Sequence, residues 1–341
     1  MTEAKNVLVT GGSGFIGSAL IRRLSRSAKY SICNLDKLTY ASNPIALTDV
    51  QHKSTYKFYQ IDILNLQGVQ KIIFEFQPDI IYHLAAETHV DRSIESSDLF
   101  LQTNVLGTHN MLKAGLAYWE SLSKRKAEQF RFHHVSTDEV YGDLGKYGRF
   151  FTEKSPYYPS SPYSASKASS DHLVRAWHRT YGLPVLITNC SNNYGPFQNS
   201  ETLIPKVITN AICGETIPVY GNGKQKRDWL YVDDHADALM VIAEKASMGS
   251  TYNISGNNTL TNLQVIQNIC KLLERLMPKN YRGHSQFDKL IRFVEDRPGH
   301  DIKYSLDAKK LERDLHWKPK ETFETGLEKT VKWFVDQMFY T

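Results

Sequence analysis

Short runs of hydrophobic residues recur along the first 190 residues of this chain. Such short segments, above all the apolar run at residues 6–10, are typical of strands buried in a parallel sheet. They fall at residues 6–10, 31–35, 56–61, 79–84, 131–136 and 184–189. Helical segments lie between most of them, notably at 15–26, 67–76, 98–122 and 161–181. This alternation predicts an α/β fold with a doubly wound parallel sheet.

The pattern changes near residue 190. Segments become shorter, turn signals such as Tyr220-Gly221-Asn222-Gly223 appear, and aromatic and basic residues fall in loops. We therefore expect one domain over residues 1–190, completed by segments that return from the C-terminal half. A smaller, mixed C-terminal lobe is expected over residues 191–341. No clear linker separates the two, so they should pack tightly.

The composition is that of an ordinary soluble globular protein, with 41% hydrophobic and 23% charged residues among 341 and a net charge of +5. Basic residues cluster only at 124–126 and 309–310, which favours solvated helix ends over nucleic-acid binding. The four cysteines form no CxxC pair, so we expect reduced thiols and no metal site. No apolar run could span a bilayer and no secretion signal precedes the first strand. A cytoplasmic protein without a membrane partner is expected.

A glycine-rich segment follows the first predicted strand and opens the first predicted helix. Residues 11–17, GGSGFIG, satisfy both GxxGxxG and GxGxxG. Such glycines allow a tight turn and a close approach of the backbone to a pyrophosphate, which the helix amides then bind. The strand before, the helix after and Asp36 at the end of the next strand favour a Rossmann-type dinucleotide site over a plain glycine-rich turn. Asp36 favours NAD over NADP because it would repel a 2′-phosphate, although Lys37 weakens this argument slightly.

A tyrosine and a lysine one helical turn apart form the first candidate for chemistry. Tyr163 and Lys167 fall on the helix after the fifth strand. The lysine and the positive charge of a nicotinamide would lower the pKa of the tyrosine and favour a phenolate base. A YxxxK spacing is common by chance, and an exposed helix pair is its ordinary explanation. Its place downstream of a dinucleotide fold favours catalysis.

Thr137, Asp138 and Glu139 lie just past the carboxyl end of the fifth strand, where ligands bind in α/β sheets. Thr137 can donate a hydrogen bond to a sugar hydroxyl or ketone. A polar strand end or a helix cap would explain the triplet if it stood alone. Beside Tyr163 and Lys167, however, two adjacent carboxylates suggest a second proton transfer. An enzyme that only moves hydride does not need them, whereas an enzyme that also expels water does.

Several motifs together make the chain resemble the extended short-chain dehydrogenase/reductases that act on nucleotide sugars. They are GGSGFIG at 11–17, LAAETHVDRS at 84–93, STDEVYG at 136–142, YSASK at 163–167, SNNYGP at 191–196, RDWLYVDDH at 227–235 and DRPGHD at 296–301. The resemblance extends from residue 7 to about residue 333. It points to the branch of 4,6-dehydratases that act on dTDP-glucose, because the related 4-epimerases lack the Asp138-Glu139 pair.

The resemblance implies a redox-neutral hydro-lyase that converts dTDP-glucose into dTDP-4-keto-6-deoxyglucose and water. Tyr163 would remove the C4 hydroxyl proton, with Lys167 holding it ionised and Thr137 assisting the oxidation. Glu139 would remove the C5 proton, and Asp138 would protonate the departing C6 hydroxyl. NAD would take the C4 hydride and return it to C6, so it acts as a recycled cofactor.

Matching by motif also assigns the binding residues. The cofactor positions are Gly11, Gly14, Phe15, Ile16, Gly17, Asp36, Lys37, Leu38, Thr39, Asp62, Ile63, Leu84, Ala85, Ala86, Thr103, Tyr163, Lys167 and Asn193. The substrate positions are Thr88, Thr137, Asn192, Leu203, Pro218, Val219, Tyr220, Arg227, Asn262, Arg297 and His300. The two arginines suit a diphosphate, because a guanidinium group binds phosphate oxygens bidentately. Thr202 stands where relatives often have lysine, so its contact with substrate is doubtful.

Rival functions remain open at this point. A UDP-glucose 4,6-dehydratase would use the same catalytic residues, because the bases differ by one methyl group, worth about 1–3 kcal/mol. The two carboxylates disfavour a 4-epimerase or a decarboxylase. The presence of every expected catalytic residue type disfavours an inactive NAD-binding sensor or scaffold. The family also suggests a homodimer that pairs the helices around 98–122 and 161–181.

Overall fold

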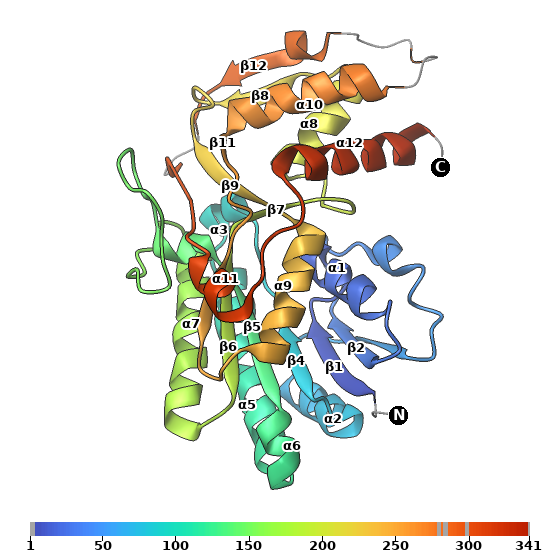
Figure 1. Cartoon of the computed structure of the whole chain (residues 1–341), viewed down its shortest axis with the longest axis vertical. Coiled ribbons are helices and arrows are strands. Elements are labelled where there is room, and N and C mark those ends of the chain that lie inside the picture. Colours follow the sequence, from blue (N-terminus) through green and yellow to red (C-terminus); the bar gives the residue numbers. More distant parts are fainter. Residues whose placement is uncertain (1–3, 278–280, 282–285, 297–299, 340–341) are drawn as a thin grey trace.

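One seven-stranded sheet of parallel strands organises the larger part of the molecule (Figure 1). The computed structural model describes residues 4–277, 281, 286–296 and 300–339. The strand order is β10-β6-β5-β4-β1-β2-β3. The strands are β1 Lys5–Thr10, β2 Tyr30–Asp36, β3 Tyr56–Gln60, β4 Ile80–His83, β5 Arg131–Thr137, β6 Val185–Cys190 and β10 Thr251–Ile254. The order reverses between β1 and β4, which confirms the predicted doubly wound, Rossmann-type sheet.

Helices cover both faces of this sheet. One face carries α1 Phe15–Leu24, α9 Val232–Lys245 and α11 Lys309–Leu315, and the other carries α2 Leu66–Phe76, α5 Thr108–Glu120 and α7 Pro162–Tyr181. Successive strand residues point to opposite faces. In β1, therefore, Val7 and Val9 join the core beneath α1 and α9, whereas Leu8 joins the core beneath α2, α5 and α7. Burial on both faces explains why the central strands are rich in hydrophobic residues, whereas β3, at the edge of the sheet, is largely exposed.

A second, smaller lobe is built from the C-terminal half and lies at the top of Figure 1. It holds a three-stranded mixed sheet of β11, β9 and β7 and a parallel pair of β12 and β8. Its elements are β7 Asn192–Tyr194, α8 Leu203–Cys213, β8 Ile217–Tyr220, β9 Lys226–Tyr231, β11 Thr259–Thr261, α10 Asn262–Leu276, η4 Phe287–Leu290, β12 Ile291–Val294 and α12 Phe323–Phe339. The expected mixed lobe is therefore present, with α9 and β10 returning to the large sheet. The division at residue 190 remains a prediction.

The helix predicted over 98–122 is divided. The chain forms α4 Asp98–Phe100, a π-helical segment η2 Leu101–Gly107, and then α5. A Cβ at Gly107 would lie 2.5 Å from Ile63 Cδ1, so the missing side chain lets this segment approach the end of β3. The side chain of Asn104 accepts from the Glu87 N–H at 2.8 Å and donates to the Glu87 carbonyl at 2.9 Å. These contacts hold the wider turn, and hydrophobic spacing alone does not reveal them.

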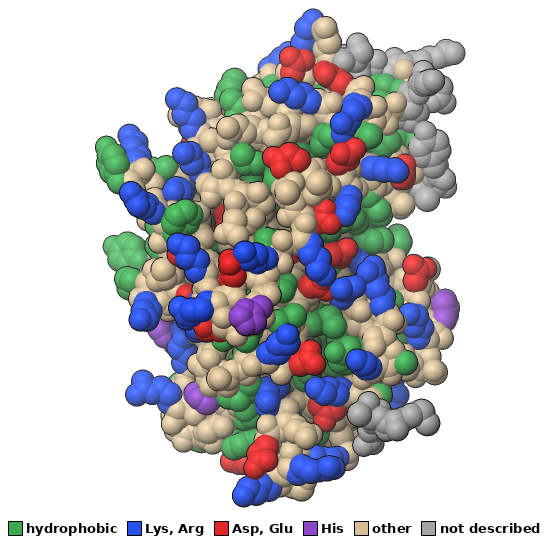
Figure 2. Space-filling view, viewed as in Figure 1, with side chains coloured by type: hydrophobic (Ala, Val, Ile, Leu, Met, Phe, Trp, Pro, Cys, Tyr) green, Lys and Arg blue, Asp and Glu red, His purple; other side chains and the backbone are tan. Residues whose placement is uncertain are grey.

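Short helices complete the described chain. They are η1 Pro44–Leu47, α3 Val90–Glu95, α6 Lys124–Gln129 and η3 Asp138–Tyr141. Within the residues that the structure describes, no helix is both long and apolar enough to cross a membrane. On the face shown in Figure 2, basic and acidic side chains are interspersed.

The turn between β1 and α1 requires glycine for two different reasons. Gly11 has a positive φ of 68°, and a Cβ there would lie 2.8 Å from the backbone of Ala85 at the end of β4. Gly17 lies in α1, and its Cβ would lie 2.2 Å from the carbonyl oxygen of Gly11. The glycines thus let the first turn of α1 lie directly on the chain that leaves β1.

Gly17→Ala should lower the free energy of unfolding by about 3 kcal/mol, because a backbone oxygen cannot move aside as a side chain can. Gly115→Ala is the matched control in a helix, since its Cβ would lie 3.3 Å from the ring of Phe132. There the gain in helix propensity, about 1 kcal/mol, offsets the tight contact. Urea unfolding measures both. Equal stabilities of the two variants would contradict the packing described for Gly17.

Candidate active site

A cavity of about 350 Å³ lies at the carboxyl ends of β1, β2, β4, β5 and β6, and we call it the central cavity. This is the edge of the sheet, beside the reversal of strand order, where open α/β folds bind ligands. The predicted cofactor positions that line it are Gly11, Gly14, Phe15, Ile16, Gly17, Asp36, Lys37, Thr39, Asp62, Ile63, Leu84, Ala85, Ala86, Thr103, Tyr163, Lys167 and Asn193. Leu38 does not line it. Its φ is 59°, and its N–H donates to Asp36 Oδ1 at 2.8 Å.

Asp36 is held against the wall of the central cavity by its own hydrogen bonds. Its Oδ2 accepts from the N–H of Ser13 at 2.9 Å, inside the glycine-rich turn. Its Oδ1 accepts from the Ser42 hydroxyl at 3.1 Å as well as from Leu38. Beside it, Lys37 Nζ lies 3.6 Å from Asp62 Oδ2 and 3.7 Å from Glu87 Oε1. Carboxylates therefore surround this lysine.

Unsatisfied polar atoms in the wall of the central cavity suit a bound dinucleotide. Several buried polar atoms that line it have no hydrogen-bond partner among the described residues. They are Thr103 Oγ1, Ser136 Oγ, Ser191 Oγ, Asn192 Oδ1 and Gln198 Oε1. Leaving a buried polar group unsatisfied costs about 1–3 kcal/mol. Together with the glycine turn, whose backbone no Cβ covers, these atoms suit a polar ligand such as NAD.

Thr137 both caps a helix and faces the central cavity. It is the last residue of β5, where it pairs with Cys190 of β6, and it precedes η3. Its Oγ1 accepts from the Glu139 N–H at 3.2 Å. The helix cap proposed from the sequence as the alternative to a catalytic role is therefore present. The same hydroxyl donates to Asp138 Oδ1 at 3.3 Å, and Thr137, Asp138 and Glu139 all line the cavity. Structural and chemical roles coexist at this residue.

Asp138 is an unusual carboxyl group because it is almost completely buried, at 2% exposure. Burial raises its pKa well above the usual range, and the nearby charges of Glu139 and Asp228 add to the rise. The guanidinium of Arg227 acts in the opposite direction but does not outweigh them. Burial therefore favours the protonated form of Asp138, the form that can give up a proton.

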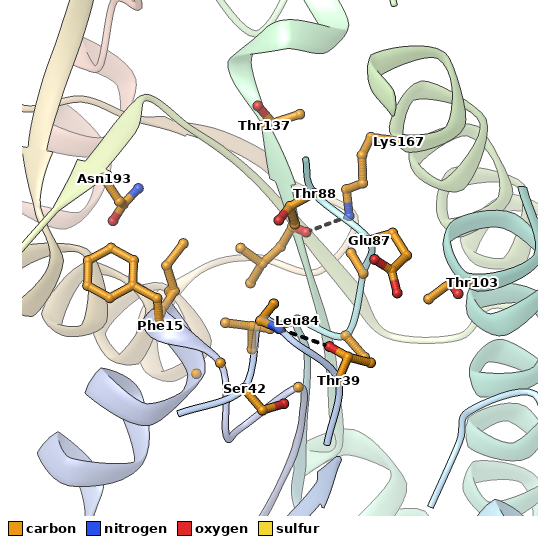
Figure 3. Close-up of a pocket in the computed structure, with 18 of the residues that line it drawn as sticks. Phe15, Thr39, Ser42, Leu84, Glu87, Thr88, Thr103, Thr137, Lys167 and Asn193 are labelled. Carbon is orange, nitrogen blue, oxygen red and sulfur yellow. Dashed lines mark hydrogen bonds between the residues drawn. The ribbon is translucent and has the colours of Figure 1, made fainter. Parts of the chain in front are cut away.

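Tyr163 and Lys167 stand one turn apart on α7, which begins with a capping box at Ser161. Both are buried. Lys167 Nζ donates to the Val135 carbonyl of β5 at 2.9 Å, the dashed line beside its label in Figure 3. Burial lowers the pKa of Lys167. Burial and the charge of Glu139 raise the pKa of Tyr163 well above its usual value, so in the protein alone the expected lowering by Lys167 does not prevail.

The predicted substrate residues fall into two groups. Thr88, Thr137 and Asn192 line the central cavity, and Thr88 and Thr137 lie on the Lys167 side in Figure 3. The others lie in the second lobe and do not line it: Leu203 begins α8, Pro218, Val219 and Tyr220 belong to β8, Arg227 belongs to β9, Asn262 begins α10, and His300 follows β12. Arg297 lies outside the described residues.

Polar contacts draw part of this second group together around Asp296. Gln225 Nε2 donates to Asp296 Oδ2 at 2.8 Å, and His300 Nδ1 lies 2.6 Å from Asp296 Oδ1. The N–H of Asn262 donates to the Gln225 carbonyl at 3.0 Å. Buried oxygens of Gln225 and Asn262, Oε1 and Oδ1, have no partner in the described part of the chain. They remain available to a ligand.

Arg227 lies between the two groups. Its exposure is only 6%. Its guanidinium donates to the Asp301 carbonyl at 3.0 Å. The same group lies 4.5 Å from the centre of the Tyr304 ring. Its charge also acts on Asp138. The two lobes therefore meet near this arginine.

Other residues that line the central cavity were not predicted. They are Leu35, Ala41, Ser42, Ile61, Glu87, Val135, Ser136, Cys190, Ser191, Gln198, Asn199 and Thr202. Glu87, Ser136 and Ser191 belong to the recognised motifs, so their position next to predicted site residues could have identified them. Gln198 and Asn199 lie in the loop before α8 and carry no signal in the sequence. Thr202, which sequence reasoning left in doubt, does line the cavity, and its hydroxyl donates to the Asn199 carbonyl at 2.8 Å.

Comparison with known proteins places this geometry in a family. Residues 8–330 match the family model of GDP-mannose 4,6 dehydratase. The chain belongs to this family. A dTDP-glucose 4,6-dehydratase of Neisseria meningitidis is 54% identical over 332 residues, which are 97% of this chain and 94% of that protein. The resemblance inferred from the motifs is therefore confirmed.

Solved structures agree with the fold. The dTDP-glucose 4,6-dehydratase of Bacillus anthracis, in complex with NAD, is 42% identical, with a TM-score of 0.85 and coverage of 97% of this chain and 96% of that one. DesIV, the dTDP-glucose 4,6-dehydratase of Streptomyces venezuelae with NAD and TYD bound, is 39% identical. Its TM-score is 0.87, with 98% of each chain covered.

Asp138→Asn should stabilise the protein at neutral pH, because asparagine mimics the protonated acid that the folded state prefers. The folded-state pKa is raised, so the wild-type protein loses stability as pH rises from the unfolded pKa, about 3.9, toward the folded value. We expect a gain of about 0.5–2 kcal/mol at neutral pH that shrinks as the pH approaches 4. Urea unfolding at both pH values measures it. Asp49→Asn, at an exposed position, is the control, and an equal gain there would refute the assignment.

Proposed function

We propose that this chain is an NAD-dependent dTDP-glucose 4,6-dehydratase. This hydro-lyase converts dTDP-glucose into dTDP-4-keto-6-deoxyglucose and water without net redox change. The observation that carries the proposal is one cavity that holds the Tyr163–Lys167 pair, the buried Asp138 and Glu139 beside a dinucleotide cradle. Relatives that carry this enzyme's name, one of them 54% identical over almost the whole chain, support it.

NAD would bind along the carboxyl ends of the strands. The amides of the glycine-rich turn would bind its pyrophosphate, and Asp36 would bind a ribose next to β2. Thr103, Ser136 and Ser191 offer the polar atoms that the protein leaves unsatisfied. Bound NAD supplies a hydride acceptor for C4 that later serves as the hydride donor to C6, and its oxidised ring supplies a positive charge.

The first proton transfer belongs to Tyr163. Its phenolate would take the proton of the C4 hydroxyl while Thr137, which lines the same cavity, orients that oxygen. Burial keeps Tyr163 protonated in the protein alone, so ionisation needs cations close by. Lys167 is one, and the oxidised nicotinamide is the other. The base is therefore formed only when cofactor is in place.

The second and third proton transfers belong to the carboxyl pair. A ketone at C4 acidifies the proton on C5, which Glu139 would remove as a carboxylate. Asp138 would then give its proton to the C6 hydroxyl, which leaves as water. Adjacent positions at the start of η3 give the two groups different environments, as an acid and a base acting together require. Arg227, Asn262 and His300 would bind the nucleotide diphosphate at the second lobe.

Glu139→Gln should stop the reaction after oxidation at C4 and before the loss of water. We expect formation of 4-keto-6-deoxy sugar from dTDP-glucose, followed by its absorbance in alkali, to fall by about 10²-fold or more. Because Tyr163 and Lys167 remain, one reduced nicotinamide should accumulate in each active site. The wild-type protein should release no NADH, since the hydride returns to the sugar.

Glu128→Gln, on the exposed face of α6, is the control and should keep wild-type activity. Full activity of Glu139→Gln would remove Glu139 from its role. A wild-type product that retains its 6-hydroxyl would identify an epimerase, and a strong preference for UDP-glucose would identify the alternative dehydratase.

We further propose that the protein forms a homodimer through the helices near residues 98–122 and 161–181. Ile94, Leu99, Leu101 and Leu106 lie on α3, α4 and η2, and each is more than two-fifths exposed. The segment η2 packs on α7, so these side chains border that helix. Exposed apolar side chains gathered on neighbouring segments support a protein interface here.

Leu106→Glu should convert the dimer into a monomer, because it places a charge on the apolar interface. Light scattering coupled to gel filtration gives the mass. Ile45→Glu is the matched control, since Ile45 is 72% exposed on η1, outside the proposed interface. A monomeric wild-type protein, or a dimeric Leu106→Glu variant, would contradict this proposal.

A further inference from the structure

A buried carboxylate lies directly behind the Tyr163–Lys167 pair. Asp171 follows Lys167 by one turn of α7, and the two side chains are 0% and 5% exposed. Removing an ionised carboxylate from water is very costly unless charges and hydrogen bonds compensate for it. No step of the proposed mechanism uses Asp171, so its presence needs another explanation.

Two hydrogen bonds and one close histidine contact, from three segments, converge on this carboxylate. The Tyr157 hydroxyl donates to Oδ2 at 2.7 Å, Asn189 Nδ2 on β6 donates to the same oxygen at 3.2 Å, and His134 Nε2 on β5 lies 3.2 Å from Oδ1. Asn189 Nδ2 also donates to the Thr137 carbonyl at 3.1 Å. Asp171 is thereby connected to the end of β5, where Thr137 enters the active site.

Asp171 is ionised in this setting. Burial would raise its pKa, but the hydrogen bond with His134, the charge of Lys167 and the Tyr157 hydroxyl hold it below the usual value. Arg175, one turn further along α7, donates to the Tyr157 oxygen at 2.6 Å and adds a positive charge on that side. The carboxylate thus remains negative throughout the neutral range.

The other titratable groups that face Lys167 are neutral. Burial lowers the pKa of His83 on β4 well below its usual value and that of His134 on β5 to about 4. Burial raises the pKa of Cys190 on β6 to about 12. Among the charges that act on Lys167, Asp171 contributes most to raising a pKa that burial lowers. The ammonium therefore has its main counter-charge in Asp171.

We infer that Asp171 is a positioning residue for the first proton transfer, which holds Lys167 charged and, through Asn189, fixes the carbonyl of Thr137. The inference rests on the proposed function, because it assumes that Tyr163 needs the Lys167 cation. In this step the C4–H pair moves as hydride to NAD and the O4 proton moves to Tyr163. Asp171 touches neither reacting atom and acts through its neighbours.

The test is Asp171→Asn, which keeps the shape of the side chain and removes its charge. The substrate is dTDP-6-deoxyglucose, which has no C6 hydroxyl to expel, so only oxidation at C4 is followed, by the absorbance of the reduced nicotinamide. A Lys167 that loses its proton more easily leaves Tyr163 with a higher pKa. In the pH profile of the oxidation rate, the rising limb should move to higher pH by about one unit. At a pH on or below that limb, the oxidation rate should therefore be about tenfold lower than that of the wild-type protein.

Two further variants separate this role from a merely structural one. Tyr157→Phe removes a hydrogen bond to Asp171 but leaves its charge, so it should not move the limb. In a Lys167→Met background, Asp171→Asn should lower the rate no further, because residues that act through one another are not additive. An unmoved limb, or a full additional loss in that background, would overturn the inference.

If Asp171→Asn alone does not fold, the Lys167→Met/Asp171→Asn protein still tests the pairing. Lys167 and Asp171 are buried opposite charges one helical turn apart. Removing one of them leaves the other without its counter-charge, whereas removing both does not. The double variant should therefore fold and retain NAD, and its failure to fold would count against the pair. Wild-type protein that does not dehydrate dTDP-glucose would refute the proposed function instead, which keeps the two failures distinct.

Discussion

The close contact between the glycine-rich turn and the end of β4 determines where everything else in this molecule can lie. Gly11 meets the backbone of Ala85 with no room for a side chain, and Gly17 meets the carbonyl of Gly11 in the same way. Both contacts occur where the strand order reverses, between β1 and β4. The base of the cavity at that edge is therefore backbone without side chains. Asp36 and the Thr137 segment lie at its margin because the parallel strands that carry them end there.

Burial then sets the chemistry of the groups at this margin. It raises the pKa of Asp138 and of Tyr163, and it lowers that of Lys167. For Asp138 the shift is useful, because a neutral carboxyl is what an acid needs. For Tyr163 and Lys167 it opposes catalysis, since both must carry charge. A site buried to exclude water thus needs cations near the tyrosine and an anion near the lysine, and Asp171 meets the second need.

The sequence was most informative where one local pattern decides the structure. Short hydrophobic segments between helices allowed most of the large sheet to be predicted. A return of the chain from the C-terminal half was expected, but the strand that makes it, β10, was not located. The π-helical segment within the helix over 98–122 depends on contacts with Glu87 and Ile63, which meet it only after folding. In the site, positions inside motifs were found, but Gln198 and Asn199 reach the central cavity through a loop path that no local pattern encodes. The role of Asp171 was not predicted, because a single aspartate on a helix carries no functional signal in the sequence. Only the folded chain brings it near His134.

The junction of the two lobes explains why this family can act on a sugar carried by a nucleotide. Strand β6 ends at Cys190 and β7 begins at Asn192, so one residue separates the sheet that bears the cofactor cradle from the sheet of the second lobe. Asn192 pairs with Trp229 on β9, the strand that also carries Arg227. A ligand long enough to reach from Thr137 to the contacts around Asp296 must therefore cross this junction. Binding energy from the nucleotide end can then hold the sugar against Asp138 and Glu139, which is how contacts remote from the reacting atoms contribute to catalysis.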